Sequence, residues 1–137
     1  MLRHPKNQYD LDHMKQMVLP PPLKALLPAD IQCHCEGALF KKNERVFHAG
    51  KKPAWMFYVV SGELILERTG SHGESVVLQR IRQGFISEAS LKVAAYHCDA
   101  IAMVDTTAIQ IPVKALTQSL EHDPAFASRW ISMLNQE

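Results

Sequence analysis

Two neighbouring stretches carry side chains suited to small-molecule chemistry. Tyr96-His97-Cys98 places a phenol, an imidazole and a thiol in succession, and Glu88 lies eight residues earlier. An imidazole that titrates near neutral pH, beside a carboxylate and a thiol, could line an effector site. The same residues also suit a plain structural role. Glu88 would satisfy free backbone N–H groups in the first turn of a short helix, and residues 96–98 would form a loop that enters a strand.

Cys33-His34-Cys35 combines two thiols and an imidazole, which are good ligands for zinc or iron. A closed site usually takes four ligands at a wider cysteine spacing, and the third cysteine, Cys98, is remote in sequence. We therefore predict no metal site and assign the thiols a structural role. Haem held by one of the seven histidines or by a methionine stays a minority option, although the sequence has no Cys-x-x-Cys-His attachment motif.

Catalytic clusters are absent from the sequence. No two histidines lie closer than nine residues, whereas a cupin-type metal site takes two histidines one residue apart with a glutamate shortly after. The sequence also offers no obvious Ser/His/Asp set and no glycine-rich loop for phosphate. We predict a binding module and no enzyme, with a cupin-like metal enzyme as the alternative from another class.

Composition places the chain among ordinary globular domains. It has 137 residues, of which 47% are hydrophobic and 21% charged, and a net charge of +1. This length supports one buried core, and the balanced charge gives no field that would attract nucleic acid or anionic lipid. No signal peptide or run of 18 apolar residues is present, so we expect a cytoplasmic protein with free thiols and no membrane partner.

Short strands separated by turns are expected over residues 38–112. Apolar and β-branched runs at 45–48, 55–60, 63–68, 74–81, 99–104 and 108–111 alternate with glycine-containing or polar turns, which is typical of a sandwich, jelly roll or small barrel. Residues 1–37 form a leader with short helical turns. Pro20-Pro21-Pro22 should end a first helix, Leu23 to Leu27 should form one turn, and Asp30 should cap another over residues 31–36.

Two helices are expected over residues 113–137. The first spans 113–121; for the second, Asp123 is the expected N-cap and Pro124 the first helical residue. An apolar stripe lines one face of the second helix, formed by Phe126, Trp130, Met133 and Leu134. Such a stripe serves either the core or self-association. The helix has no C-cap signal before residue 137, so we expect it to be truncated.

Five segments in order resemble the sensor domain of the Crp/Fnr family. They are KNERVFHAG at 42–50, FYVVSGEL at 57–64, HGE at 72–74, FISE at 85–88 and the spacing from Ile111 to Pro124. The resemblance covers about residues 38–137. It implies a double-stranded, jelly-roll-like β-roll over 38–112 that holds an effector, with short flanking helices. It also implies the start of a dimerisation helix, hence a homodimer through the apolar stripe, and a winged helix-turn-helix that is absent from this chain. DNA would then be a partner only through that missing domain.

The residues argue against a cyclic nucleotide as the effector. Cyclic-nucleotide-binding members of the family pair the phosphate with an arginine, whose position falls at Tyr96 or Cys98 here, and no arginine occurs between Arg82 and Arg129. The usual glycine before the glutamate is Ser87. A phosphate without its cation loses about 1.5–3 kcal/mol.

We therefore predict an unidentified small-molecule effector. The expected pocket residues are Ile86, Ser87, Glu88, Ala89, Tyr96, His97 and Cys98. Three alternatives stay open. The effector is a cyclic nucleotide bound through another cation, such as Lys92 or Lys114; the domain is a haem, gas or redox sensor; or the domain only dimerises.

Overall fold

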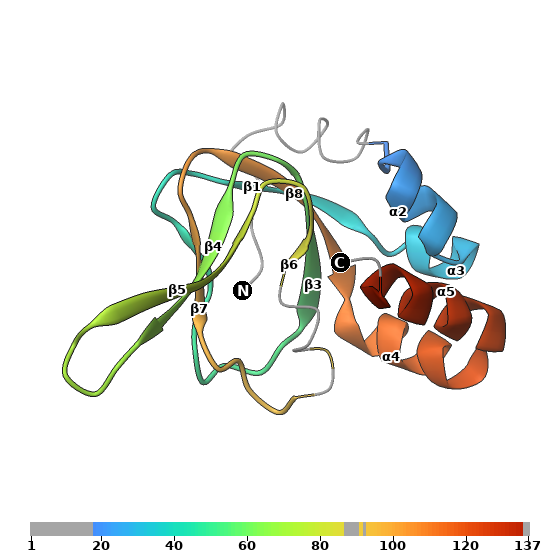
Figure 1. Cartoon of the computed structure of the whole chain (residues 1–137). Helices are drawn as coiled ribbons and strands as arrows, with labels where there is room; N and C mark the ends of the chain where they lie inside the picture. The colour runs from blue at the N-terminus through green and yellow to red at the C-terminus, as the bar shows by residue number, and fades with distance from the viewer. Residues whose placement is uncertain (1–17, 87–90, 92, 136–137) are drawn as a thin grey trace.

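The computed structural model describes residues 18–86, 91 and 93–135. Within them, strands form two four-stranded antiparallel sheets that together make a roll (Figure 1). One sheet has the order β1-β8-β3-β6 and the other β2-β7-β4-β5. The strands are β1 Glu36–Phe40, β2 Arg45–Phe47, β3 Trp55–Ser61, β4 Leu64–Thr69, β5 Ser75–Ile81, β6 Gly84–Ile86, β7 Asp99–Ala102 and β8 Thr106–Pro112. The predicted mainly β roll is confirmed.

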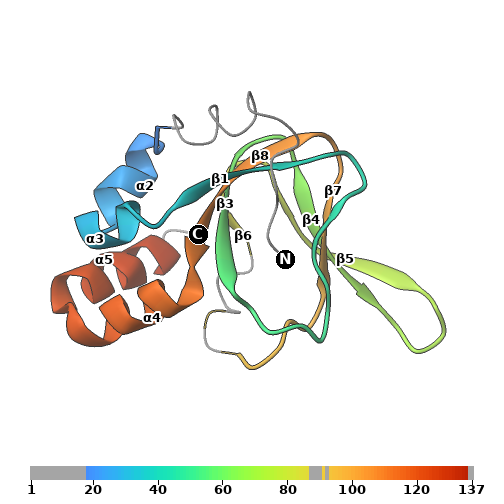
Figure 2. The ribbon, with the colours of Figure 1, turned by 180° about the vertical axis from the view of Figure 1, so that it is seen from behind.

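The four helices of the described residues gather at one end of the roll, beyond the β1-β8-β3-β6 sheet, while the β4–β5 hairpin projects from the opposite end (Figures 1 and 2). The helices are α2 Pro21–Leu26, α3 Ala29–Gln32, α4 Val113–His122 and α5 Pro124–Asn135. Among the described residues, no helix is long and apolar enough to cross a membrane.

The β1-β8-β3-β6 sheet is buried on both faces. Along β3, Phe57 and Val59 point into the roll interior, whereas Met56 and Tyr58 point to the core beneath the helices. This division follows from the two-residue period of a strand, which turns successive side chains to opposite faces. A strand covered on both faces has a continuous apolar run, which explains why 55–60 lacks a polar alternation.

The structure adds one feature to the expectations for residues 18–37 and corrects another. Pro20 is the residue before α2, and Pro21 and Pro22 form its first turn. Proline suits this position because its fixed φ is helical and its missing N–H would have no intrahelical partner. The three prolines therefore begin a helix; whether they also end one falls outside the described residues. Asp30 makes no capping bond, because α3 already begins after Pro28.

Two strands were not predicted. Gly84–Ile86 forms β6, an edge strand paired with β3, although no strand was expected between Ile81 and Asp99. Glu36–Phe40 forms β1, paired with β8, and takes in Glu36, which was expected to end a helical turn. A three-residue strand is too short to show a period, and both strands exist because of pairing with segments far away in sequence.

Gly62, in the turn between β3 and β4, gives a first test of the fold. Its φ is +99°, and an added Cβ would clash with Thr106 Oγ1 and lie 2.7 Å from the carbonyl oxygen of Asp105. Gly62→Ala should lower the free energy of unfolding by about 2–5 kcal/mol, from backbone strain plus overpacking. Gly73→Ala is the control, because Gly73 has φ +85° with no atom within 4 Å of an added Cβ. Equal losses for the two variants in urea denaturation would contradict the close packing at Gly62.

The start of α5 gives a second test. The backbone N–H of Phe126 donates to Asp123 Oδ1 at 3.1 Å, so the predicted N-cap is confirmed. Asp123→Ala should cost about 1 kcal/mol of stability through loss of this bond. Asp30→Ala removes an aspartate that caps nothing and should change stability by less than about 0.5 kcal/mol. Chemical denaturation of both variants distinguishes the loss of the capping hydrogen bond from the loss of a negative charge alone.

Candidate functional site

The predicted effector-pocket residues lie in different environments. Ile86, Tyr96 and Cys98 are buried in the apolar core of the roll interior. His97 is exposed to solvent between two buried neighbours. Ser87, Glu88 and Ala89 lie outside the described residues. The structure therefore brings three of these residues together, inside the roll and between its two sheets.

Tyr96 is held in place by an aromatic stack and by hydrogen bonds. Its ring stacks on Phe47 with centroids 3.7 Å apart and planes 8° apart. Its hydroxyl donates to the Trp55 carbonyl at 3.1 Å. The Tyr96 backbone N–H donates to Lys51 O, and Gly50 N–H donates to Tyr96 O, both at 2.9 Å. Burial raises the pKa of Tyr96 to about 12, so the phenol is a neutral hydrogen-bond donor across the physiological pH range.

One gap in the roll interior lies beside this stack. This gap admits no water-sized molecule; it is bordered by Phe47, Pro53, Trp55, Met56, Phe57, Ile86, Tyr96 and Val113. Phe57 is also in aromatic contact with Phe40, edge to face at 5.8 Å, and with Phe47 at 6.3 Å. Aromatic side chains thus occupy this part of the space between the two sheets.

Cys35 and Cys98 are not activated thiols. Cys98 is buried, and this burial raises its pKa, against a lowering effect of Arg68 and with a further raising effect of Asp99. Burial and the neighbouring Cys33 raise the pKa of Cys35 to about 11. Low pKa and exposure are what make a cysteine reactive, so Cys35 and Cys98 suit the structural role predicted for them. Among the described residues, no group of three or more potential ligands is placed to hold a metal ion.

Three of the four arginines among the described residues of the roll, 38–112, form ion pairs. Arg45 pairs with Asp99 at 2.6 Å, and Arg80 and Arg82 both pair with Glu63, at 2.6 and 2.7 Å. The charge of Arg68, on β4, does reach Cys98. Lys114, one of the two lysines proposed as a replacement cation, is exposed on α4, and Lys92 lies outside the described residues.

The apolar stripe on α5 splits between core and surface. Phe126 and Trp130 are buried in the chain's own helix-side core, and Trp130 contacts Phe85 edge to face at 5.3 Å. Met133 packs against the same core, whereas Leu134 is 37% exposed. The stripe therefore serves the core of the protomer through at least its first two residues. A role of the four residues in dimerisation stays a prediction.

Sequence reasoning missed the residues that fill the roll. Phe47, Trp55 and Phe57 were identified only as members of strands, although they surround Tyr96. Their strand propensity was the only available signal, because aromatic residues fit strands whether they line a ligand site or fill a core. Which of the two occurs depends on the packing between the sheets.

A family model described as a cyclic nucleotide-binding domain matches residues 38–123. The sequence has no match among the curated proteins. Among solved structures, the sensor domain of the transcriptional regulator DNR from Pseudomonas aeruginosa is similar, with a TM-score of 0.72 and 19% identity over 84% of this chain and 81% of that one.

Two longer regulators are also similar. The Thermus thermophilus catabolite activator protein has a TM-score of 0.67 and 20% identity, over 85% of this chain and 57% of that one. The c-di-GMP responsive regulator CLP of Xanthomonas campestris has a TM-score of 0.63 and 17% identity, over 76% and 54%. The chain thus spans little more than half of these two proteins. At identities of 17–20%, the similarity to these proteins shows a shared fold.

The aromatic packing in the roll leads to a third test. Phe47→Ala would leave a cavity beneath Tyr96 and should lower the free energy of unfolding by about 3–5 kcal/mol. Tyr96→Phe keeps the stack and loses only the hydrogen bond to Trp55, so it should cost about 1 kcal/mol. Urea denaturation measures both. A cost below about 1 kcal/mol for Phe47→Ala would mean that the roll does not depend on this ring.

Proposed function

The chain belongs to the cyclic nucleotide-binding domain family, and from this membership we propose that it is the effector-sensing domain of a Crp/Fnr-like transcription regulator. The family consists of binding domains, in agreement with the prediction of a binding module rather than an enzyme. The fold of the DNR sensor domain and of two longer regulators supports the proposal. DNA would be contacted through a further domain outside this sequence, and we expect the protein to act in the cytoplasm.

The effector in this proposal is not a cyclic nucleotide. The observation that carries this part is the Phe47–Tyr96 stack, which occupies the roll interior at one of the two positions where the family's phosphate-binding arginine is expected. The other candidate position, Cys98, is a buried neutral thiol whose pKa is raised. A phosphate at either position would lack the usual guanidinium partner, and at Tyr96 it would meet a packed aromatic ring.

A route from the roll interior to the terminal helix runs through β6. Ile86 points into the roll core, whereas its neighbour Phe85 points to the helix-side core and contacts Trp130 of α5. An effector that displaces Ile86 would therefore move Phe85 against α5. Because packed interfaces switch between discrete arrangements, a small shift of this kind can change the population of two orientations of the helix. In a homodimer formed through α5, that change would reach the DNA-binding parts.

The second candidate is a cyclic nucleotide held by a different cation. Arg68 favours it, since the charge of this residue acts on Cys98 and its side chain is exposed at the end of β4. Arg68 is therefore a better placed substitute for the missing arginine than Lys114 on the helical side. A haem, gas or redox sensor and a domain that only dimerises remain alternatives; the raised pKa values of Cys35 and Cys98 disfavour redox sensing.

Calorimetric titration with cyclic AMP and cyclic GMP distinguishes these candidates. We expect no binding tighter than a Kd of about 1 mM, which corresponds to about −4 kcal/mol. Arg68→Gln should then leave the titration unchanged. Micromolar binding that is lost in Arg68→Gln and kept in Arg82→Gln, a control at an exposed arginine that pairs with Glu63, would replace the first proposal by the second. Absorption and metal analysis of the same sample test for haem.

A further inference from the structure

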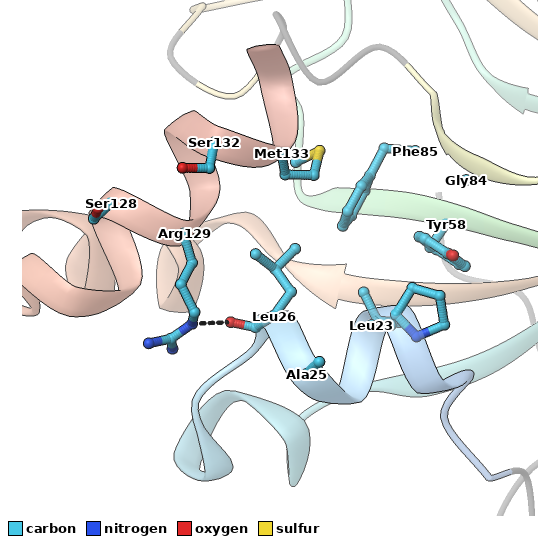
Figure 3. A pocket seen from close by; sticks show the side chains of 11 residues that line it. Leu23, Ala25, Leu26, Tyr58, Gly84, Phe85, Ser128, Arg129, Ser132 and Met133 are labelled. Atoms are coloured by element: carbon cyan, nitrogen blue, oxygen red, sulfur yellow. Dashed lines mark hydrogen bonds between the residues drawn. The ribbon is translucent and has the colours of Figure 1, made fainter. Parts of the chain in front are cut away.

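A groove on the helical side of the first sheet is separate from the roll interior. It has a volume of about 520 Å³ and lies between α2, α5 and strands β3 and β6 (Figure 3). Its lining includes Leu23 and Leu26 of α2, Tyr58 of β3, Phe85 of β6, and Arg129 and Met133 of α5. This volume is within the range of about 300–1,000 Å³ that is usual for small-molecule sites.

The walls of the groove are mainly apolar. Leu23, Leu26 and Phe85 are almost fully buried, and Met133 packs against the same core. Leu26 and Met133 lie on facing helices, and Phe85 lies between Met133 and Tyr58 (Figure 3). A ligand in this space would therefore need an apolar body, whose burial favours binding.

Tyr58 adds a hydrogen-bonding group to the groove. Only 7% of this residue is exposed, and it lines the groove. Burial raises the pKa of Tyr58, so the hydroxyl keeps its proton. A neutral phenol in the wall of a cavity can donate a hydrogen bond to an occupant with polar atoms.

Arg129 adds a positive charge. Its Nε donates to the Leu26 carbonyl at 3.1 Å, which fixes the guanidinium at the edge of the groove, and the group lies 5.7 Å from the centre of the Phe126 ring (Figure 3). Arg129 forms no ion pair with a described carboxylate. The terminal N–H groups of a guanidinium match the two oxygens of a carboxylate, so the charge of Arg129 is open to an anionic ligand.

From these features we propose that the groove binds a carboxylate with an apolar body, whose carboxylate pairs with Arg129 while the body packs on Leu26, Phe85 and Met133. The proposal is independent of the effector in the roll interior. The ligand would contact α2 and α5 at once, so its binding would stabilise the packing of the terminal helix against the roll.

The test uses decanoate as the probe, with decanol as the uncharged probe of the same length. Calorimetry should show decanoate binding at one site and decanol binding at least about 10-fold more weakly, since a charge-assisted hydrogen bond is lost. Arg129→Gln should weaken decanoate binding by about 10- to 100-fold, and Arg129→Lys should recover part of this loss. Lys24→Gln, at an exposed lysine of α2 outside the groove, should leave it unchanged.

Methionine methyl NMR locates the bound probe in the same samples. The Met133 methyl signal should shift with decanoate, whereas that of Met103, on the loop before β8, should not. Equal affinities for decanoate and decanol, or an unchanged affinity in Arg129→Gln, would overturn the proposal. A Met133 signal that follows protein concentration and ignores decanoate would also overturn it, because a second copy of the chain would then cover the groove.

Discussion

The arrangement of this domain depends on one sheet that must be covered on both faces. Strands β1, β8, β3 and β6 carry apolar side chains in both directions, so one face closes against β2, β7, β4 and β5 and the other against the helices. Ile109 and Ile111 of β8 lie beneath the helices, whereas Ala108 lies in the roll. Loss of either cover would expose a whole apolar face to water, which explains why the helices are part of the domain.

This sheet separates two sites where a ligand could bind, one on each of its faces. Inside the roll, Phe47 stacks on Tyr96 and contacts Phe57 between the sheets. On the outside, the short α2 and the last helix do not close completely over Tyr58 and Phe85, and an open groove is left. Membership of a ligand-binding family therefore does not by itself say which cavity is used. The side chains that fill or line each cavity decide it.

Much of the fold could be predicted because its signals are local. The hairpin strands, the turn at Gly62 and the Asp123 cap of α5 follow from periodicity, turn residues and capping chemistry within a few positions. The elements that were missed depend on distant partners. β6 is a strand because it pairs with β3. Pro20 to Pro22 begin a helix because Leu23 and Leu26 are buried in the core that α5 and β8 also line.

By itself, the sequence determined the β-roll class, the family resemblance, the two closing helices and the absence of an arginine in the expected phosphate site, since these are properties of neighbouring residues or of composition. Only the tertiary structure decided that Tyr96 stacks on Phe47, that Phe126 and Trp130 enter the core, and that Arg129 meets Leu26 beside an open groove. The contact between Leu26 and Arg129 joins residues 103 positions apart. Contacts of this kind arise from packing between elements, and no local pattern encodes them.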